Sequence, residues 1–525
     1  MSKSRALVSP TIDSPAFALN TYVRTLAAAD LVNLRDVKII TPPSFRETLT
    51  LRSPSSLACE RLVAAAIRDA VKRCVPPRPC ERKVVEDGRW TWATAPEDVL
   101  RYVFRWLRAL DELSDVAGRA TLRSCILVCK AWNSVGTEQC WRNISVRGDQ
   151  DSMASLVATV SRSARGQIVG QAHLGSYVRG AEFDLDNSVP EASFEFLVST
   201  AVHLCPNLRC LYISHDTAAL SLPSLAAIFE SCPSLVLFFL NPASIHISYH
   251  GHAKREDLWK TDAAGRAIIE GVGRLRALCF HSSGRGDVHS AINRSAGPNL
   301  ISWAGHASAV EHVAANCPEL KFLEGGELAD PDLAVLAAGC HHLVSVNLED
   351  AEGKVTDDGV KAIIHHCPAI EELSLFNTGV TFATLNALKS HRPLTFLSFG
   401  GEGELFETTG TEIALCALLS ARGALLTGLK VGEPRWHMGA ELAIMLPIVT
   451  PKLQSLHLVG MNSTFYLAWL ADRLPALLEL GTDDSVDSDV LADSIPSRVS
   501  LCGSDYVSMD PDEALWRCLA GSTPP

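Results

Sequence analysis

The chain has 525 residues and a mass of 56.6 kDa, enough for about three or four ordinary domains or for one elongated array of repeats. Its 47% hydrophobic and 20% charged residues fit a globular protein with a large core and exclude a disordered polyelectrolyte. The net charge of −12 argues against a protein that coats nucleic acid, and no uncharged apolar run is long enough to span a membrane.

The first 90 residues differ from the rest in charge. They hold 15 Lys and Arg against 9 Asp and Glu, a balance of +6, whereas the remainder carries −18. We predict a leader over residues 1–90 that is partly disordered and contains one amphipathic helix, Ser56–Arg73. A Pro- and charge-rich linker, Val75–Arg89, ends it. Early prolines and Asp13 interrupt the start of the chain, so we expect no signal peptide.

A short helical module is predicted over residues 95–141. Pro96 suits a first helical turn. The apolar residues that follow it repeat at helical spacing and form one stripe: Val99, Leu100, Val103, Phe104 and Leu107. A second stripe begins after a charged loop and contains Leu127, Val128, Cys129 and Trp132, with Trp141 further on. So few residues cannot bury much apolar surface alone, which favours an interface.

These two stripes carry a resemblance to the F-box. The matching segments are Ala95-Pro96-Glu97-Asp98-Val99-Leu100 and Leu127-Val128-Cys129-Lys130-Ala131-Trp132, in the family's order. Ala95, Asp98 and Cys140 depart from the usual Leu, Glu and Leu, and the middle loop is longer. The resemblance implies binding to the Skp-type adaptor of a cullin-based ubiquitin ligase. The residues it assigns to adaptor binding are Pro96, Val99, Leu100, Val103, Phe104, Leu107, Leu127, Val128, Cys129, Trp132 and Trp141.

A repeat fills the rest of the chain. The frame Cys-Pro-x-Leu-x-x-Leu-x-Leu is clearest from Cys205, Cys232, Cys317, Cys340 and Cys367. Weaker copies begin at Tyr177, Val272, Gly297, His391, Gly423, Thr450 and Leu474. Most intervals lie in the twenties, a period that resembles leucine-rich repeats.

Each repeat is predicted to pair a short strand with a helix. The Leu-x-Leu alternation indicates the strand, and helix signals lie between strands: Thr356 as a cap before Asp357 and Asp358, and Asp330 as a cap before Pro331. The Thr-Asp-x-Gly and Cys-Pro signals resemble the cysteine-containing class of leucine-rich repeats often joined to F-boxes.

The expected fold class is therefore α/β, a leucine-rich-repeat solenoid (horseshoe) preceded by a small all-α F-box module. The predicted domains are the leader, an F-box-like domain over 91–146, and a repeat array over 170–525 with a C-terminal cap around Trp516. A cysteine that recurs at one position of a repeat is expected to be a small buried side chain and not half of a disulfide. We therefore expect a reducing compartment, the cytoplasm, the nucleus or both.

The residues between the leucines of each strand are expected to point out of the concave sheet and to hold a partner. They are Tyr212, Phe239, Glu324, Asn347, Glu349, Glu372, Phe376, Lys430 and His457, and all but Glu324 are assigned to substrate binding. The long insert Asn241–Gly265 and the acidic loop Gly400–Gly410 are further candidates, because extra length in a solenoid emerges as loops.

The sequence favours a non-catalytic protein without a cofactor or metal. It contains no HExxH, Cys-x-x-Cys, Walker loop or GxSxG. We predict the substrate-recognition subunit of a cullin-type ubiquitin ligase, which binds a Skp-type adaptor and a protein substrate but neither nucleic acid nor membrane. One alternative is a leucine-rich-repeat scaffold without a ligase role. The other is a metal-dependent enzyme that uses His246, His250 and His252.

Overall fold

The computed structural model describes residues 97, 100–101, 104, 130–167, 173–185, 189–215, 220–242, 263–280, 291–305, 307–349, 351, 353–401, 409–432, 438–460, 463–481, 486 and 488–502. The predicted leader with its helix, the linker, most of the long insert, residues 402–408 of the acidic loop and the predicted cap around Trp516 lie outside these residues.

The chain divides into two compact units. The first comprises Met1–Ser145, Leu156–Ala181 and Ala520–Pro525, and the second comprises Val146–Ser155 and Glu182–Leu519. In the first unit, helix α6 (Lys130–Trp141) contacts the short helix η2 (Leu174–Tyr177). The carbonyl oxygen of Arg142, next to α6, accepts hydrogen bonds from the backbone amides of Arg179 (2.6 Å) and Gly180 (3.0 Å).

The strands form one 14-stranded sheet whose order follows the chain from β1 to β14. They are β1 (Asn143–Gly148), β2 (Gly180–Leu185), β3 (Cys210–His215), β4 (Leu237–Pro242), β5 (Ala277–Phe280), β6 (Ser302–Ala304), β7 (Phe322–Glu324), β8 (Ser345–Asn347), β9 (Glu372–Phe376), β10 (Phe396–Gly400), β11 (Gly428–Gly432), β12 (Ser455–Val459), β13 (Glu479–Gly481) and β14 (Ser500–Cys502). Neighbouring strands pair in parallel from β3 through to β14.

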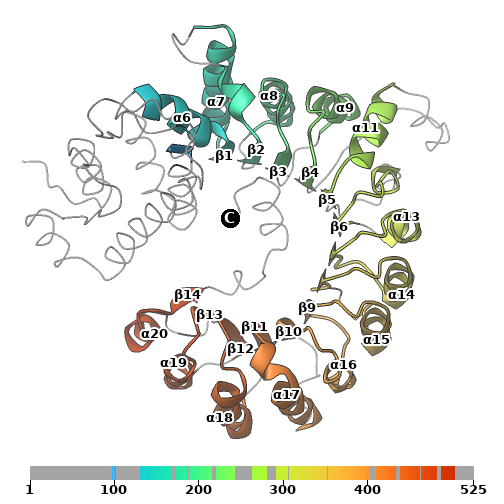
Figure 1. Cartoon of the computed structure of the whole chain (residues 1–525), viewed down its shortest axis with the longest axis vertical. Coiled ribbons are helices and arrows are strands. Elements are labelled where there is room, and N and C mark those ends of the chain that lie inside the picture. The colour runs from blue at the N-terminus through green and yellow to red at the C-terminus, as the bar shows by residue number, and fades with distance from the viewer. Residues whose placement is uncertain are drawn as a thin grey trace, which may run out of the picture. The chain divides into compact units, whose positions relative to one another are not determined.

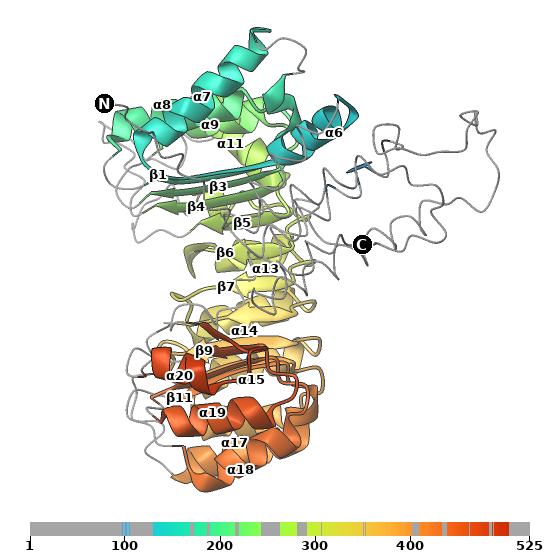
Figure 2. The ribbon, with the colours of Figure 1, turned by 90° about the vertical axis from the view of Figure 1, so that its left-hand side faces the viewer.

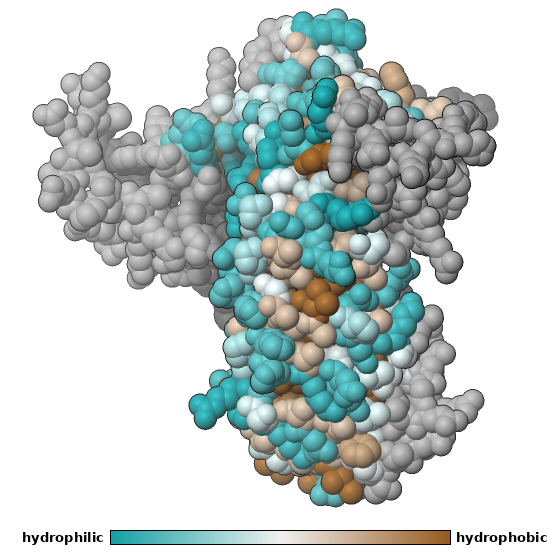
Figure 3. All heavy atoms as spheres, turned by 90° about the vertical axis from the view of Figure 1, so that its right-hand side faces the viewer, coloured by the Kyte–Doolittle hydropathy of each residue, from teal (hydrophilic) through white to brown (hydrophobic). Residues whose placement is uncertain are grey.

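Helices alternate with these strands along the chain. They are α7 (Gln150–Ala164), α8 (Glu191–His203), α9 (Leu222–Ser231), α11 (Ala263–Gly273), η3 (Ala307–Ala309), α13 (Val310–Asn316), α14 (Asp330–Gly339), α15 (Asp357–His366), α16 (Phe382–Leu388), α17 (Thr409–Arg422), η5 (Gly423–Leu425), α18 (Ala440–Val449), α19 (Thr464–Arg473) and α20 (Ser488–Ser494). In the second unit the strands line the inner side of a curve and the helices its outer side (Figure 1). On the face drawn in Figure 3, hydrophilic side chains separate the apolar ones into small patches.

The predicted α/β class and repeat solenoid are confirmed, because a parallel sheet that alternates with helices is the arrangement of a leucine-rich-repeat solenoid. All twelve sequence copies of the repeat frame, strong and weak, contain a strand. The sheet has two strands that the frame did not predict, β1 at its start and β14 at its end. β1 is Asn-Ile-Ser-Val-Arg-Gly and lacks the Leu-x-Leu alternation, so the frame could not identify it.

The sheet is held in register by one backbone interaction that recurs at nearly every repeat. The residue just before each strand donates its amide to the carbonyl of the equivalent residue in the preceding repeat. These bonds run from Val236 to Arg209 (2.8 Å), Arg276 to Val236 (2.7 Å), Ile301 to Arg276 (2.7 Å), Lys321 to Ile301 (2.8 Å) and Val344 to Lys321 (2.8 Å), and they continue to Leu478. Each repeat therefore positions the next without a shift in register.

The core lies between the strands and the helices. The leucines of the frame are buried in every repeat, as Leu211, Leu323 and Leu429 illustrate. In β6 a tryptophan, Trp303, takes the leucine position and is fully buried. Its indole nitrogen donates a 2.9 Å hydrogen bond to Oδ1 of the buried Asn293, which avoids the cost of a buried N–H without a partner.

The cysteines of the frame are buried and are not in disulfides, as the sequence predicted. The structure adds a polar role, because several thiols donate to a carbonyl of the preceding repeat. The pairs are Cys232 to Cys205 (3.6 Å), Cys317 to Gly297 (3.4 Å), Cys340 to Cys317 (3.5 Å) and Cys367 to Cys340 (3.3 Å). At the same position in the weaker copy at His391, a ring nitrogen lies 2.7 Å from the carbonyl of Ile370. A side chain there thus links two repeats even where cysteine is lost.

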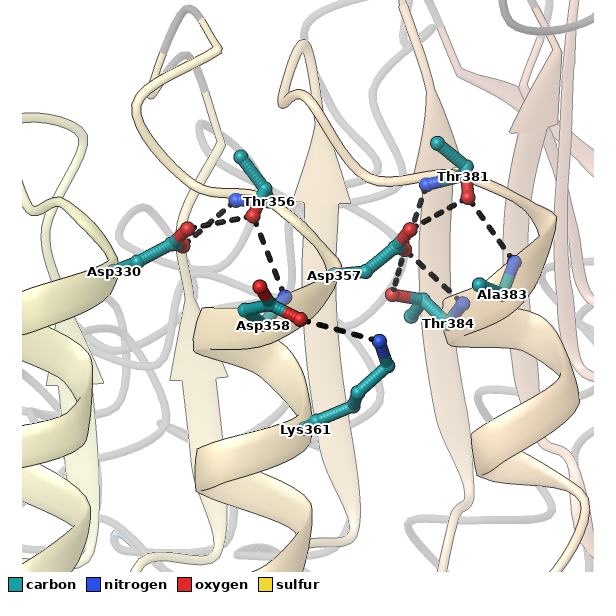
Figure 4. Close-up of polar contacts among 8 residues, drawn as sticks. All are labelled: Asp330, Thr356, Asp357, Asp358, Lys361, Thr381, Ala383 and Thr384. Atoms are coloured by element: carbon teal, nitrogen blue, oxygen red, sulfur yellow. Dashed lines mark hydrogen bonds and ion pairs between the residues drawn. The ribbon is translucent and has the colours of Figure 1, made fainter.

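A second link joins neighbouring helix N-termini (Figure 4). Asp357, the first residue of α15, accepts hydrogen bonds from the amide (2.9 Å) and hydroxyl (2.6 Å) of Thr381 and the amide (3.1 Å) and hydroxyl (2.6 Å) of Thr384. Thr381 in turn caps α16 by accepting from the amide of Ala383 (3.1 Å). The carboxylate of one repeat therefore orients the capping residue of the next.

Asp330 makes the same link one repeat earlier, and this corrects an expectation. The sequence indicated Asp330 as the cap of its own helix, but the cap position is Ala329. Asp330 instead accepts from the amide (2.8 Å) and hydroxyl (2.6 Å) of Thr356. The predicted cap Thr356 is confirmed, because its hydroxyl accepts from the amide of Asp358 (3.3 Å). Capping signals act within one helix, so they could not indicate a contact 26 residues away.

None of the helices in the described part of the chain has the length and apolar character needed to cross a membrane.

The thiols of the frame should resist alkylation in the folded protein. Burial raises the pKa of Cys205, Cys232, Cys317 and Cys367 to about 12 and that of Cys340 to about 11, and only thiolates react readily. At pH 8 we expect iodoacetamide to label these five cysteines more slowly than the half-buried Cys140, as read by peptide mass spectrometry. The difference should vanish in denaturant. Equal labelling rates in the folded protein would contradict the burial of the five frame cysteines.

Asp357→Asn should lower the free energy of unfolding by about 1.5–3 kcal/mol, because the charged acceptor of four hydrogen bonds is lost. Burial raises the pKa of Asp357, but the hydrogen bonds from Thr381 and Thr384 outweigh it and hold that pKa below its ordinary 3.8. A depressed folded-state pKa stabilises the fold above the unfolded pKa, and this stabilisation is lost as the pH falls through the folded value. The difference between wild type and variant should therefore be full near pH 7 and shrink below about pH 4.

The matched control is Asp358→Asn. Asp358 is the next residue and is exposed, and among the described residues its side chain makes only a 3.3 Å ion pair with Lys361, so its loss should change stability by less than about 1 kcal/mol. Urea denaturation at several pH values measures both variants. Equal effects at the two positions would contradict the link.

Candidate functional site

The candidate site is the face of the sheet that the helices leave uncovered. Strand pairing places one residue of each strand in a single line across this face, which we call the middle row. It consists of Tyr212, Phe239, Cys279, Ala304, Glu324, Asn347, Ser374, Ser398, Lys430 and His457. Its chemistry changes along the line from aromatic through small and polar to basic, because the positions between the core leucines are free to vary.

A charged cluster forms at the basic end of the middle row. Glu349 follows β8, and its Oε1 accepts a 2.8 Å hydrogen bond from the hydroxyl of Ser398 in β10. Nζ of Lys430 in β11 lies 3.3 Å from Oε2 and 3.4 Å from Oε1 of the same carboxylate. The Lys430 ammonium also lies 4.5 Å from the ring centroid of Phe376 in β9. The Glu349 carboxylate therefore connects the end of β8 to β10 through a hydrogen bond and to β11 through a largely buried ion pair.

An aromatic pair lies at the other end of the middle row. The rings of Tyr212 and Phe239, on the adjacent strands β3 and β4, stack with centroids 4.2 Å apart and planes 16° from parallel. Both side chains are half-buried, so part of each ring faces solvent. Such a platform can bind an apolar or planar group.

The structure brings the predicted substrate-binding residues together in two groups. Glu349, Phe376 and Lys430 form the cluster, and the Oδ1 atom of Asn347 adjoins it by accepting from the amide of Glu349 (3.1 Å). His457 is aligned with Lys430 and buried. Tyr212 and Phe239 form the second group, separated from the first by β5, β6 and β7.

Glu372 and Ser398 lie on the strands β9 and β10 beside the charged cluster. Glu372 begins β9, two positions before the middle-row residue Ser374, and is paired with Phe396. Ser398 was not among the predicted residues, although it contacts Glu349 directly. It lies in the weak repeat copy at His391, and its position between Leu397 and Phe399 is the signal that could have identified it.

The two halves of the predicted F-box-like module contact each other. Arg101, from the first half, donates to Glu138 of α6 at 3.3 Å and also lies 2.8 Å from Glu97. Leu100 and Phe104 are fully buried, so they pack inside the chain. The predicted stripe is therefore not wholly exposed.

The other predicted adaptor-binding residues are only partly placed. Trp141 ends α6 and is half-buried, and Trp132 lies within the same helix. Seven lie outside the described residues: Pro96, Val99, Val103, Leu107, Leu127, Val128 and Cys129. The insert histidines His246, His250 and His252 also lie outside them. Within the described ranges, no group of three or more His, Cys, Asp or Glu side chains could hold a metal ion.

Comparisons with known proteins add little to this geometry. No family model matches the sequence, and no curated protein matches it. Among solved structures, one chain of the crystal structure of the Rad7 and Elc1 complex in yeast is similar at a TM-score of 0.42 and 16% sequence identity, and the match covers 87% of this chain and 100% of that chain. A likeness of this size carries no argument about function.

The Glu349–Lys430 pair should show energetic coupling. Its side chains are only 18% and 11% exposed, and removing one partner leaves a poorly solvated charge. We expect Glu349→Gln and Lys430→Met each to lower stability by about 1–3 kcal/mol, and the double variant to lose about 1 kcal/mol less than their sum. Urea denaturation of the four proteins measures this cycle.

The exposed pair Asp358 and Lys361 provides the control cycle, for which we expect almost no coupling. Additive effects at Glu349 and Lys430 would show that the cluster is solvated and not a structural element of the inner face.

Proposed function

We propose that the chain is a substrate-recognition subunit of a cullin-type ubiquitin ligase. In this role residues 95–141 bind a Skp-type adaptor and the repeat array holds a protein substrate. The chain then contributes proximity, and the transfer of ubiquitin takes place on other subunits.

The observation that carries this proposal is the contact between Arg101 and Glu138, 37 residues apart in the chain. It joins the predicted first half of the motif to helix α6, which begins at Lys130, and this supports a single module made of both halves. A chance match of two short patterns would not require them to meet. The order of the module and the repeat array in the sequence supports the same role.

The repeat array supports the substrate-holding part of the proposal. The backbone bonds that set the register at each repeat hold the outward positions at fixed spacings, so the sheet itself does not have to form when a partner binds. The middle row presents the stacked rings of Tyr212 and Phe239 on that sheet, and aromatic side chains commonly anchor partners.

A scaffold without a ligase role is the second candidate, and one observation favours it. Leu100 and Phe104, both assigned to adaptor binding, are buried in their own chain. In the ligase role these two side chains act indirectly, by packing the module so that its remaining apolar residues face the adaptor. In the scaffold role the module only packs.

A pull-down with a purified Skp-type adaptor separates the two. We expect wild type to retain the adaptor and Val103→Asp with Leu107→Asp to lose at least tenfold of the affinity, because two charges enter an apolar contact. Failure of the wild type to retain the adaptor would leave the scaffold as the function.

The control for surface charge is Val335→Asp with Phe382→Asp, which places the same substitution on exposed apolar residues of α14 and α16. This variant should bind the adaptor like wild type. Equal thermal melting of the three proteins shows that any loss is not unfolding. Retention by the Val103 and Leu107 variant with an intact fold would contradict docking through this stripe.

A further inference from the structure

A line of alternating basic and aliphatic side chains runs along the start of the strands from β3 to β8. It occupies the residues just before those strands, and we call it the strand-start row. Its members are Arg209, Val236, Arg276, Ile301, Lys321 and Val344. Figure 2 shows the strands β3 to β7 of the second unit stacked in this order.

The spacing within the strand-start row is fixed by the backbone. Each member donates its amide to the carbonyl of the member before it at 2.7–2.8 Å, and neighbouring strands lie about 4.8 Å apart. Cations therefore recur about every 9.6 Å, with an aliphatic residue midway between them. The spacing of the cations is constant, because it follows the register of the sheet.

The fold does not require these charges. Arg209, Arg276 and Lys321 are exposed, and none of them forms an ion pair with another described residue. The aliphatic members are half-buried, so each keeps part of its surface in solvent. A single surface lysine does not indicate a binding site. Three cations that alternate with apolar residues in a chain of net charge −12 do indicate one.

Neighbouring charges leave the strand-start row positive. One position earlier than Leu275, the exposed Arg274 adds a cation, and at the equivalent position before Leu320 the exposed Glu319 adds an anion. The row itself ends where Glu371 takes the next position, after Val344. The positive stretch therefore ends after the repeat of β7.

We propose that the strand-start row is a docking surface for an acidic amphipathic helix of a partner protein. In an α-helix, residues seven apart lie on one side and are separated by about 10.5 Å, with residues three or four apart midway. A helix that alternates acidic and aliphatic residues at half-heptad spacing therefore matches the row charge for charge. Over three cations the two spacings differ by about 2 Å, which the long side chains of Arg and Lys accommodate.

The aliphatic members of the row favour an acidic helix over a nucleic acid as the bound partner. A phosphate backbone would gain from the three cations but would meet apolar side chains at every second position. An acidic helix can place leucines there and bury them. The inference builds on the proposed role of the array in holding another protein, but it needs no adaptor and stands apart from residues 95–141.

The test uses the full chain and a labelled synthetic helix of about 24 residues, with Glu at every seventh position, Leu midway between and an Ala/Gln background. Fluorescence anisotropy at low and moderate salt measures binding. We expect wild type to bind this helix and Arg209→Glu, Arg276→Glu, Lys321→Glu together to weaken binding at least tenfold. The same helix with Gln in place of Glu should bind at least fivefold more weakly, and added salt should weaken the acidic helix selectively.

A matched control reverses three other exposed cations, Arg266, Arg392 and Lys452, to Glu, which changes net charge equally. It should bind the acidic helix within twofold of wild type. Equal loss in both triple variants, no binding by wild type, or a single-stranded oligonucleotide that binds more tightly than the helix through the same three cations would each overturn the proposal. Because no adaptor is present, failure here is distinguishable from failure of the ligase role.

Discussion

The fold depends on the fact that no repeat can cover its own leucines. Each strand contributes only two or three core side chains, and these are buried because a helix lies behind them and the next repeat lies beside them. The row of amides that bond one repeat back keeps this arrangement in register from β3 to β13. Every side chain that points away from the core therefore has a fixed position along the sheet.

Polar links between repeats add order to this apolar stacking. The thiol of Cys340 and the carboxylate of Asp357 each bond to a neighbouring repeat, one near the start of a strand and the other at a helix N-terminus. A leucine face alone would tolerate many neighbours, whereas these bonds require an acceptor or donor at a set position of the adjacent repeat. His391 shows that the link can persist when the cysteine does not.

The same register gives the sheet two surfaces of different chemistry. Near one end of the middle row, Lys430 forms a largely buried ion pair with Glu349, which follows β8. The strand-start row keeps its cations exposed. Stability comes from the stacked core, and the residues that the core does not constrain can vary without loss of the fold.

The sequence by itself determined the repeat, the position of twelve strands and the burial of the cysteines, because these follow from spacings within about nine residues. It predicted Thr356 as a cap for the same reason. Only the tertiary structure decided what Asp330 binds, that Ser398 joins Glu349 and Lys430, and that Leu100 and Phe104 are covered. It also supplied β1 and β14. The contacts of Asp330 and of Glu349 join residues 26 to 81 positions apart, and no local sequence pattern specifies which distant side chain a residue will contact.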